Sequence, residues 1–229
     1  MSTLNWAAAE DYNNFCYNCR IIKAVIFDID GVLLDSFEAN LRFYQNLMTK
    51  AGYRPPTKEE FHHLFHLTLI GVIKIITESP SETEINRIFE LGKSHKMLRA
   101  TKPPPMIKNA EKVVSILSKK YLLGIVTSRI KETVYESPEL AKLQKHFKVA
   151  VSYQDTINHK PHPEPLLLAV KKLEVRPEEC VYVGDVENDI KAGKAAGMKT
   201  ILYSKNKLEI ADYCTPSLED LPSIISNLQ

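Results

Sequence analysis

The amino-acid sequence predicts an α/β protein, with a doubly wound parallel sheet and an all-helical unit inserted after the first strand. Short apolar runs alternate with amphipathic helical patterns along most of the chain, which is typical of parallel strands joined by helices. One stretch, residues 37–100, carries helical patterns alone. The length of 229 residues also suits one core domain of about 150 residues with a substantial insert.

The expected strands are short runs rich in β-branched and aromatic residues. The first, residues 21–27, is apolar over nearly its whole length, as expected of a strand buried on both faces in the middle of a parallel sheet. It ends at a polar residue, Asp28. The remaining strands are expected at 122–127, 147–151, 180–183 and 199–203.

The expected core helices fill the intervals between these strands. Apolar residues recur with the helical period over 107–119, 131–145, 164–173 and 186–196, and Pro138 interrupts the second of these. A closing helix is expected at 217–228.

The inserted unit is expected to hold helices at 37–51, 57–66, 69–77 and 81–98. Thr57 with Glu60, and Ser81 with Glu84, have the spacing of a capping box at a helix start. The prolines at 103–105 then end any helix and stiffen the return to the core. We therefore expect an N-terminal extension at 1–20, a core domain formed by 21–36 and 101–229, and a helical cap domain at 37–100, hinged at 35–36 and 101–105.

Composition argues against several classes of protein. Lys and Arg total 30 and Asp and Glu total 28, a net charge of +2, so we expect no nucleic-acid partner. The longest apolar stretch, 67–76, contains Lys74 and is shorter than the ~20 residues of a membrane helix, so we expect no membrane partner. Without a signal-peptide pattern or a disulfide scaffold, a cytoplasmic location is expected. Cys16 and Cys19 form a lone CxxC that lacks the other ligands of a zinc site.

Acidic residues follow the first expected strand, at the sheet edge where such proteins bind ligands. Asp28 and Asp30 stand two residues apart there, and Gly31 permits a tight turn. A single Asp in this place is commonly a turn residue or an N-cap. Burying a carboxylate without a cation would cost several kcal/mol, so the pair predicts a metal ion or a cationic partner.

Three further segments add polar groups to this edge. Thr127 and Ser128 offer a hydroxyl and loop amides to a phosphate oxygen, although Thr127 could simply cap its strand. Lys160 precedes a proline-rich run that would fix its direction, although most lysines are solvated surface residues. Asp185 and Asp189 follow the fourth strand, and Asp189 could also complement the dipole of the helix that begins there.

In chain order these segments are the Asp-x-Asp-Gly-Val-Leu-x-Asp-Ser motif at 28–36, the strand ending in Thr127-Ser128, the Lys-Pro-x-Pro-x-Pro run at 160–165, and the Gly-Asp-x-x-x-Asp motif at 184–189. The set closely resembles the haloacid dehalogenase-like (HAD) hydrolases, and most of all their phosphoglycolate phosphatase and β-phosphoglucomutase branch. The resemblance extends from about residue 21 to residue 203. It implies a Rossmann-like core with a helical cap.

The resemblance and the preference of Mg²⁺ for oxygen ligands imply the same metal site. Its ligands would be the carboxylates of Asp28 and Asp185 and the backbone carbonyl of Asp30, while Asp189 would hold a metal-bound water or Lys160. Asp28 would be the nucleophile that forms an aspartyl-phosphate, and Asp30 the acid and then the base. The phosphate oxygens would be bound by Thr127, Ser128 and Lys160, next to the Gly31 turn.

The implied function is therefore Mg²⁺-dependent hydrolysis of a small phosphorylated metabolite, as in phosphoglycolate phosphatases. A phosphomutase of the β-phosphoglucomutase type stays open, because mutases keep all four motifs. Dehalogenases and phosphonatases lack the acid at the position of Asp30, and a retired binding protein would be expected to have lost an acid. Either a monomer or a homodimer is compatible with the sequence.

The segment 65–71 would face the metal by resemblance to related caps. His66 and Thr68 are therefore candidate specificity residues. The alternative is that His66 lies with His62 and His63 on one face of a helix.

Overall fold

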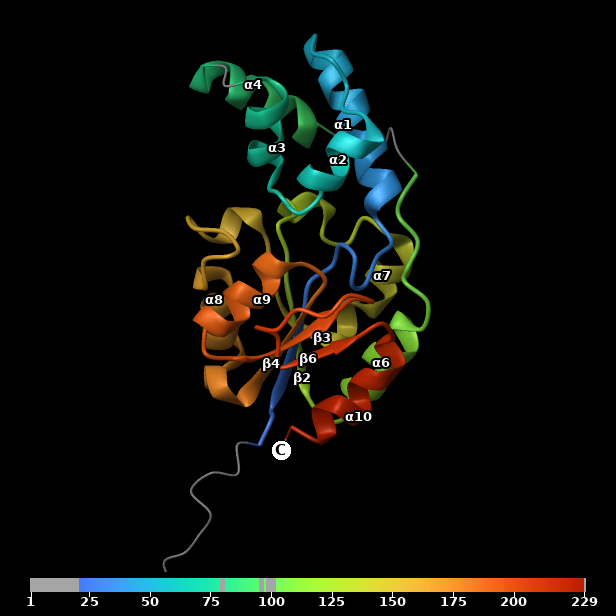
Figure 1. The fold of residues 1–229 in the computed structure, drawn as a ribbon, viewed down its shortest axis with the longest axis vertical. Coiled ribbons are helices and arrows are strands. Elements are labelled where there is room, and N and C mark those ends of the chain that lie inside the picture. Colours follow the sequence, from blue (N-terminus) through green and yellow to red (C-terminus); the bar gives the residue numbers. More distant parts are fainter. Residues whose placement is uncertain (1–20, 79–80, 95–96, 98–101, 229) are drawn as a thin grey trace, which may run out of the picture.

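The computed structural model describes residues 21–78, 81–94, 97 and 102–228, and a six-stranded parallel sheet forms its centre (Figure 1). The expected extension at 1–20, with Cys16 and Cys19, lies outside the described residues. The strands are β1 (Ala24–Phe27), β2 (Leu122–Val126), β3 (Phe147–Val151), β4 (Cys180–Gly184), β5 (Lys199–Tyr203) and β6 (Tyr213–Thr215), in the spatial order β3-β2-β1-β4-β5-β6. The order reverses between β1 and β4, which is where such sheets bind ligands.

The predicted doubly wound α/β fold is confirmed, and helices cover both faces of the sheet (Figure 1). One face packs against α6 (Ala110–Leu117), α7 (Pro138–Leu143) and α10 (Leu221–Ser226), and the other against α8 (Glu164–Leu173) and α9 (Glu187–Ala195). Side chains alternate along β1, so Val25 and Phe27 join the first layer while Ala24 and Ile26 join the second. This double burial explains the apolar run at 24–27, whereas the strand does not extend to 21 as expected, and Ile21 is 56% exposed.

The strand at 213–215 was not expected, because three residues at a sheet edge show no clear pattern. The single helix expected at 131–145 is also wrong. The segment consists of a 3₁₀ turn at Lys131–Thr133, helix α7, and a second 3₁₀ turn at Gln144–His146. Pro138 has no N–H to give to a preceding turn, and it occupies the first turn of α7, so the helix begins there.

The inserted helices are α1 (Phe37–Ala51), α2 (Lys58–Leu64), α3 (Leu69–Ile76) and α4 (Glu82–Lys93). Figure 1 shows them as a group at one end of the sheet. They enclose a hydrophobic cluster of their own, with Leu47, Met48, Phe61, Val72 and Ile88 fully buried. Apolar contacts among α1–α4 therefore hold this group together.

The helix starts in this group follow their capping residues. The Thr57–Glu60 box is confirmed, with Glu60 N–H donating to Thr57 Oγ1 at 3.2 Å and Thr57 N–H to Glu60 Oε2 at 2.8 Å. The second expected box is only half formed. Ser81 Oγ accepts from Glu84 N–H at 3.3 Å, but the Glu84 carboxylate binds Arg87 instead.

Two backbone segments connect the inserted helices to the sheet, and they run side by side. Asp35 N–H donates to the carbonyl of Pro105 at 2.9 Å, and Ile107 N–H donates to the carbonyl of Leu33 at 2.9 Å. Thr101, at the edge of the expected second hinge, lies outside the described residues. The helical group therefore leaves and rejoins the core at one place.

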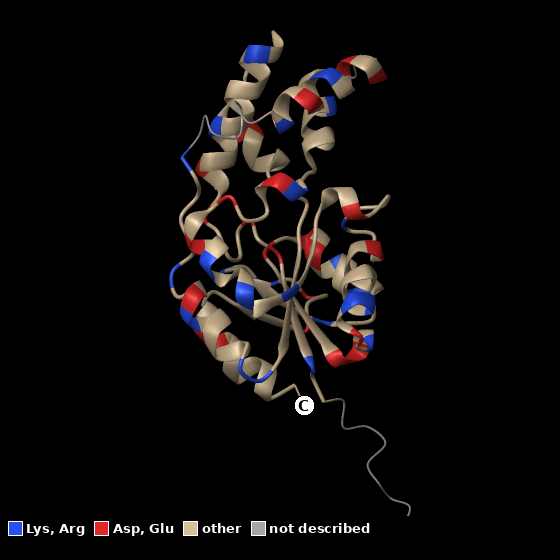
Figure 2. Cartoon of the chain, turned by 180° about the vertical axis from the view of Figure 1, so that it is seen from behind, with Lys and Arg blue, Asp and Glu red and all other residues tan. Residues whose placement is uncertain are grey.

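Charged residues of both signs are mixed along the outer helices (Figure 2). The same view shows acidic segments in the loops between the sheet and the inserted helices. Among the described residues, no helix is both long enough and apolar enough to cross a membrane.

Candidate active site

The ends of β1 and β4 bring the acidic segments together. The two strands pair in parallel with Phe27 opposite Val183, and Asp28 N–H continues the ladder to the carbonyl of Val183 at 2.9 Å. Asp28 and Asp185 therefore leave the sheet at the same edge. Asp189 returns to this edge from the first turn of α9.

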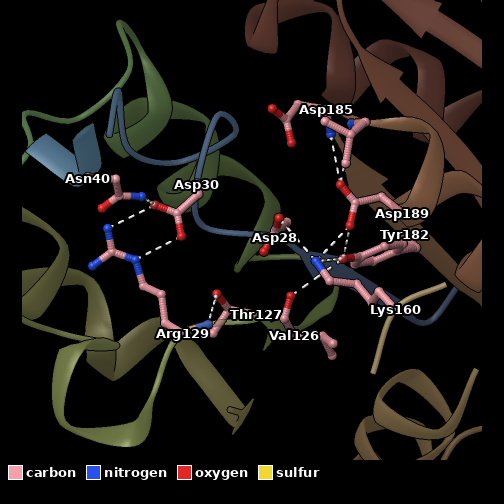
Figure 3. A network of polar contacts seen from close by, with 11 residues as sticks. Asp28, Asp30, Asn40, Val126, Thr127, Arg129, Lys160, Tyr182, Asp185 and Asp189 are labelled. Carbon is pink, nitrogen blue, oxygen red and sulfur yellow. Dashed lines mark hydrogen bonds and ion pairs between the residues drawn. The ribbon is translucent and has the colours of Figure 1, made fainter. Parts of the chain in front are cut away.

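Asp28 lies at the centre of the site (Figure 3). The residue is only 7% exposed, and one carboxylate oxygen, Oδ2, is 3.1 Å from Lys160 Nζ. The other oxygen, Oδ1, is buried without a hydrogen-bond partner. Burial raises the pKa of Asp28 to about 7, and it outweighs the opposing effect of Lys160. The Asp28 carboxylate would therefore be stabilised by a second positive charge close to Oδ1.

Lys160 is enclosed by oxygen atoms. Its Nζ is 2.6 Å from Asp189 Oδ1 and 3.1 Å from the hydroxyl of Tyr182. Although burial acts to lower the pKa of Lys160, the charges of Asp189 and Asp28 hold it well above the usual value. Lys160 is therefore a fixed ammonium group and not the solvated lysine of the alternative interpretation.

Asp189 is fully buried, and both of its carboxylate oxygens have partners. Oδ1 accepts from Lys160 and Tyr182, while Oδ2 accepts from the backbone N–H groups of Asp185 and Val186 at 3.2 and 3.4 Å. The side chain thus orients Lys160 and caps the start of α9 at the same time. Of the two roles expected for Asp189, holding Lys160 is the one that its contacts favour.

The acids at this edge fit a divalent cation. Carboxylate oxygens of Asp28, Asp185 and Asp189 lie within 4.8 Å of one another. Burial, followed by the charges of Asp189 and Asp28, raises the pKa of Asp185 well above its usual value. Since Asp189 is committed to other donors, Asp28 Oδ1 and the Asp185 carboxylate are the oxygens that could bind a metal directly. Hard oxygen ligands of this kind suit Mg²⁺.

Gly31 allows the loop after β1 to approach Asp185. Its φ of +74° is one that residues with a side chain rarely adopt. A Cβ placed there would lie 2.0 Å from Asp185 Oδ2, which is a clash. The glycine is thus required both by the turn and by the carboxylate that lies against it.

Asp30 takes part in a separate network on the other side of Asp28 (Figure 3). Arg129 binds its two oxygens through Nε and Nη2 at 2.9 and 2.8 Å, and Asn40 donates to Oδ1 at 3.2 Å. Although burial acts to raise it, the pKa of Asp30 is held below its usual value by Arg129. The Asp30 side chain is thus directed away from the acid cluster, which leaves its backbone carbonyl as the expected metal ligand.

Thr127 and Ser128 follow β2 toward the same edge. Thr127 is 4% exposed, and its Oγ1 accepts from Arg129 N–H at 3.2 Å, so its hydroxyl supports the turn that carries Arg129. Ser128 lines the pocket described below. A phosphate-binding role for these two residues stays a prediction.

A pocket of about 480 Å³ lies between this edge and the inserted helices. His66 lines it, in the turn that follows α2. Thr68 does not line it, and its Oγ1 caps α3 by accepting from Gly71 N–H at 3.2 Å. The other acidic, basic and amide side chains in the lining are Asp28, Asp30, Asn40, Arg129, Glu132, Glu136, Lys160, Asp185, Asn188 and Asp189.

Sequence reasoning missed three side chains of this site. Arg129 directly follows Thr127-Ser128, so its position at a strand end was a usable signal. Asn40, on α1, and Tyr182, inside β4, carried no such signal, because neither helical period nor strand pattern distinguishes them from neighbouring residues.

Comparisons with known proteins identify the family of this chain. Residues 25–203 match the family model described as haloacid dehalogenase-like hydrolase. The chain is 30% identical to pyrophosphatase PpaX of Bacillus cereus over 218 residues, which cover 90% of this chain and 98% of that protein. The chain therefore belongs to the haloacid dehalogenase-like hydrolase family, as its motifs predicted. It is an enzyme of the hydrolase class, with relatives named pyrophosphatases.

Solved structures show the same fold. A putative phosphoglycolate phosphatase from Lactobacillus plantarum has a TM-score of 0.76 at 20% identity, covering 89% of this chain and 99% of that one. A β-phosphoglucomutase from Clostridium difficile has a TM-score of 0.73 at 24% identity, covering 91% and 97%. The arrangement of a six-stranded sheet with inserted helices is therefore shared with both.

Proposed function

We propose that this protein is an Mg²⁺-dependent phosphatase that hydrolyses a small phosphate monoester through an aspartyl-phosphate on Asp28. The observation that supports it most directly is the buried Asp28 carboxylate, which has a cation on one oxygen and no partner on the other. Such a group is held at the floor of a pocket large enough for a small metabolite.

Mg²⁺ would be held by Asp28, Asp185 and the Asp30 carbonyl, and it would supply positive charge to the phosphoryl oxygens. Lys160 supplies a second positive charge. Its attachment to Asp189 keeps the ammonium group directed at Asp28. Thr127 and Ser128 would bind the remaining phosphate oxygens as charge builds on them.

In the first step an Asp28 oxygen bonds to phosphorus, the ester oxygen leaves, and Asp30 gives that oxygen a proton. In the second step Asp30 takes a proton from water as the water oxygen attacks phosphorus, and the bond to Asp28 breaks. The ion pair with Arg129 keeps Asp30 in the carboxylate form that the second step needs. Before the first step, Asp30 must bind a proton.

We further propose that residues 37–100 form a cap domain, hinged at 35–36 and 101–105. Support comes from the separate apolar cluster of the inserted helices and from the two adjacent connections at Asp35 and Pro105. Closure of such a cap would exclude water from the phosphoryl group. Replacing residues 38–100 by a short flexible loop should leave a core that binds Mg²⁺ but loses substrate discrimination. A core that fails to fold, or that keeps full selectivity, would contradict a separate cap.

The function is tested with purified protein and p-nitrophenyl phosphate, with and without Mg²⁺. We expect hydrolysis that stops in excess chelator and returns with Mg²⁺, together with inhibition by vanadate or fluoroaluminate. Full activity in chelator would end the metal mechanism, and no hydrolysis of any phosphate ester would point to a retired scaffold.

A phosphomutase is the second candidate, because the fold is shared with a β-phosphoglucomutase. It would transfer phosphate between two hydroxyls of one sugar and would need a bisphosphate primer. Formation of an isomeric sugar phosphate, faster than release of inorganic phosphate, would favour this alternative.

A further inference from the structure

The pocket has two ends with different chemistry. Asp28, Lys160 and the acid cluster lie at the floor, where the phosphoryl group would bind. Above them, the inserted helices contribute a wall that is mostly apolar and aromatic, formed by Ala39, Phe43, Tyr44, Phe65, Leu67 and Leu69. This second end would surround the alcohol that leaves with the ester oxygen.

Free positive charge is scarce in this pocket. Among the described residues that line it, Lys160 and Arg129 are the only lysine and arginine, and they lie on opposite sides of Asp28 (Figure 3). Lys160 belongs to the phosphoryl end through Asp189 and Asp28. Among the described lining residues, Arg129 is therefore the guanidinium that could meet a second anionic group on a substrate.

Arg129 is already neutralised. Its side chain is 7% exposed, and Nε and Nη2 bind Asp30. Its remaining nitrogen, Nη1, binds Glu136 Oε1 at 2.5 Å and the carbonyl of Thr133 at 3.1 Å. Four of the five N–H groups of the guanidinium thus donate to protein oxygens, and a substrate anion would compete with two carboxylates for its charge.

The pocket lining around Arg129, which comes from the core segment after β2, carries excess negative charge. Asp30 and Glu136 both bind Arg129, and Glu132 adds a third carboxylate to the pocket lining. Among the described residues, no cationic side chain forms an ion pair with Glu132, whose Oε2 accepts from the amide of Gln154 at 3.0 Å. A carboxylate or second phosphate on the leaving group would be repelled here, whereas an uncharged group would not.

We propose that the substrate is a phosphate monoester whose leaving alcohol carries no negative charge, a polyol or sugar in which the transferred phosphate is the only anionic group. This inference rests on the proposed phosphatase function and refines it. Asn40, Tyr44 and His66 place polar groups among the apolar residues of the wall, which suits an alcohol bearing further hydroxyls. Pyrophosphate, bisphosphates and 2-phosphoglycolate fall outside this class.

The test compares kcat/KM within matched pairs that differ by one anionic group. One pair is 2-hydroxyethyl phosphate and 2-phosphoglycolate, and another is fructose 6-phosphate and fructose 1,6-bisphosphate. We expect the less charged member of each pair to be preferred by at least about tenfold, because the described residues at the alcohol end of the pocket include no lysine or arginine that is free of a carboxylate partner. Equal or better hydrolysis of the more charged member would overturn the inference.

Charge variants locate the cause of this preference. Glu132→Gln and Glu136→Gln should each reduce the preference by about threefold to tenfold. Glu132 is exposed, so its variant should fold even if the Glu136 variant does not. The control is Glu219→Gln, which removes the same charge from an exposed pair with Lys112 on α6 and should leave the ratio unchanged. A ratio that neither pocket variant alters would contradict the electrostatic argument.

The proposed function can fail independently of this inference. In that case neither the pairs nor p-nitrophenyl phosphate would be hydrolysed. Calorimetric binding of the same pairs to the Mg²⁺-loaded protein still decides the inference, since tighter binding of the more charged member overturns it and weaker binding supports it.

Discussion

Replacement of Asp28 by Asn should make the metal-free protein more stable while it destroys activity. Asp28 is 7% exposed in the parent protein, and one of its carboxylate oxygens has no partner. Burial raises its pKa from 3.8 to about 7, which corresponds to a cost of about 4 kcal/mol for the ionised form. Asn keeps the size but loses the attraction to Lys160, so we expect a net gain of roughly 1–3 kcal/mol.

The pH dependence of this effect follows from the direction of the shift. A carboxyl whose pKa is higher in the folded state binds protons on folding, so its contribution to stability falls as pH rises from about 4 to about 7. The full penalty remains above pH 7. In chelator, the stability difference between Asp28→Asn and the parent should therefore be small near pH 4 and largest near pH 8.

Turnover should fall by at least about 10⁴-fold, a barrier increase of roughly 5.5 kcal/mol, because the variant lacks the nucleophile. Urea unfolding in chelator at pH 4, 6 and 8 measures the stability, and Mg²⁺ should stabilise the parent more than the variant. A variant less stable than the parent at pH 8 in chelator would refute the burial argument. Turnover within tenfold of the parent would remove Asp28 from its role.

Three other substitutions test neighbouring parts of the structure. Arg129→Met leaves the Asp30 carboxylate without its cation, and breaking this buried pair should cost about 3–5 kcal/mol in urea unfolding. Gly31→Ala places a Cβ 2.0 Å from Asp185 Oδ2, so calorimetry should show Mg²⁺ binding weakened by about tenfold or more. Burial acts to raise the pKa of Asp212, but Lys194, Lys199 and Thr200 lower it to about 2. The ionised Asp212 carboxylate therefore stabilises the folded state above pH 4, and this stabilisation is lost as pH falls toward 2. Asp212→Asn should lower the free energy of unfolding by about 1–2 kcal/mol at pH 7 and by little at pH 2. Unchanged stability of the Arg129 or Asp212 variant at pH 7, or parental Mg²⁺ affinity in the Gly31 variant, would contradict the corresponding contact.

The parts of the site that sequence reasoning found are those defined by local pattern. Asp28 ends a run that must be buried on both faces, and Asp185 ends another, so parallel pairing of the two strands was enough to bring them to one edge. Gly31 was recognisable for a similar reason, because a tight turn after a strand is a local requirement.

Contacts between distant segments needed the tertiary structure. Asp30 and Arg129 are 99 residues apart, and their ion pair depends on the direction in which each side chain leaves its own turn. The prediction of a single helix at 131–145 also failed. The helix begins only at Pro138, and Glu136, which precedes it, binds Arg129. Thr68 was placed in the right segment, but its hydroxyl is used by the start of α3.

The sequence by itself determined the fold class, the family and the acids at the strand ends, because hydrophobic period and turn chemistry act over a few residues. Only the tertiary structure decided which carboxylate keeps a free oxygen, which one holds Lys160 and which one is neutralised by Arg129. Those assignments depend on burial and on distances between side chains from β1, β4, α1, α9 and the turn after β2. Electrostatic energy varies steeply with both quantities, and neither can be read from spacing along the chain.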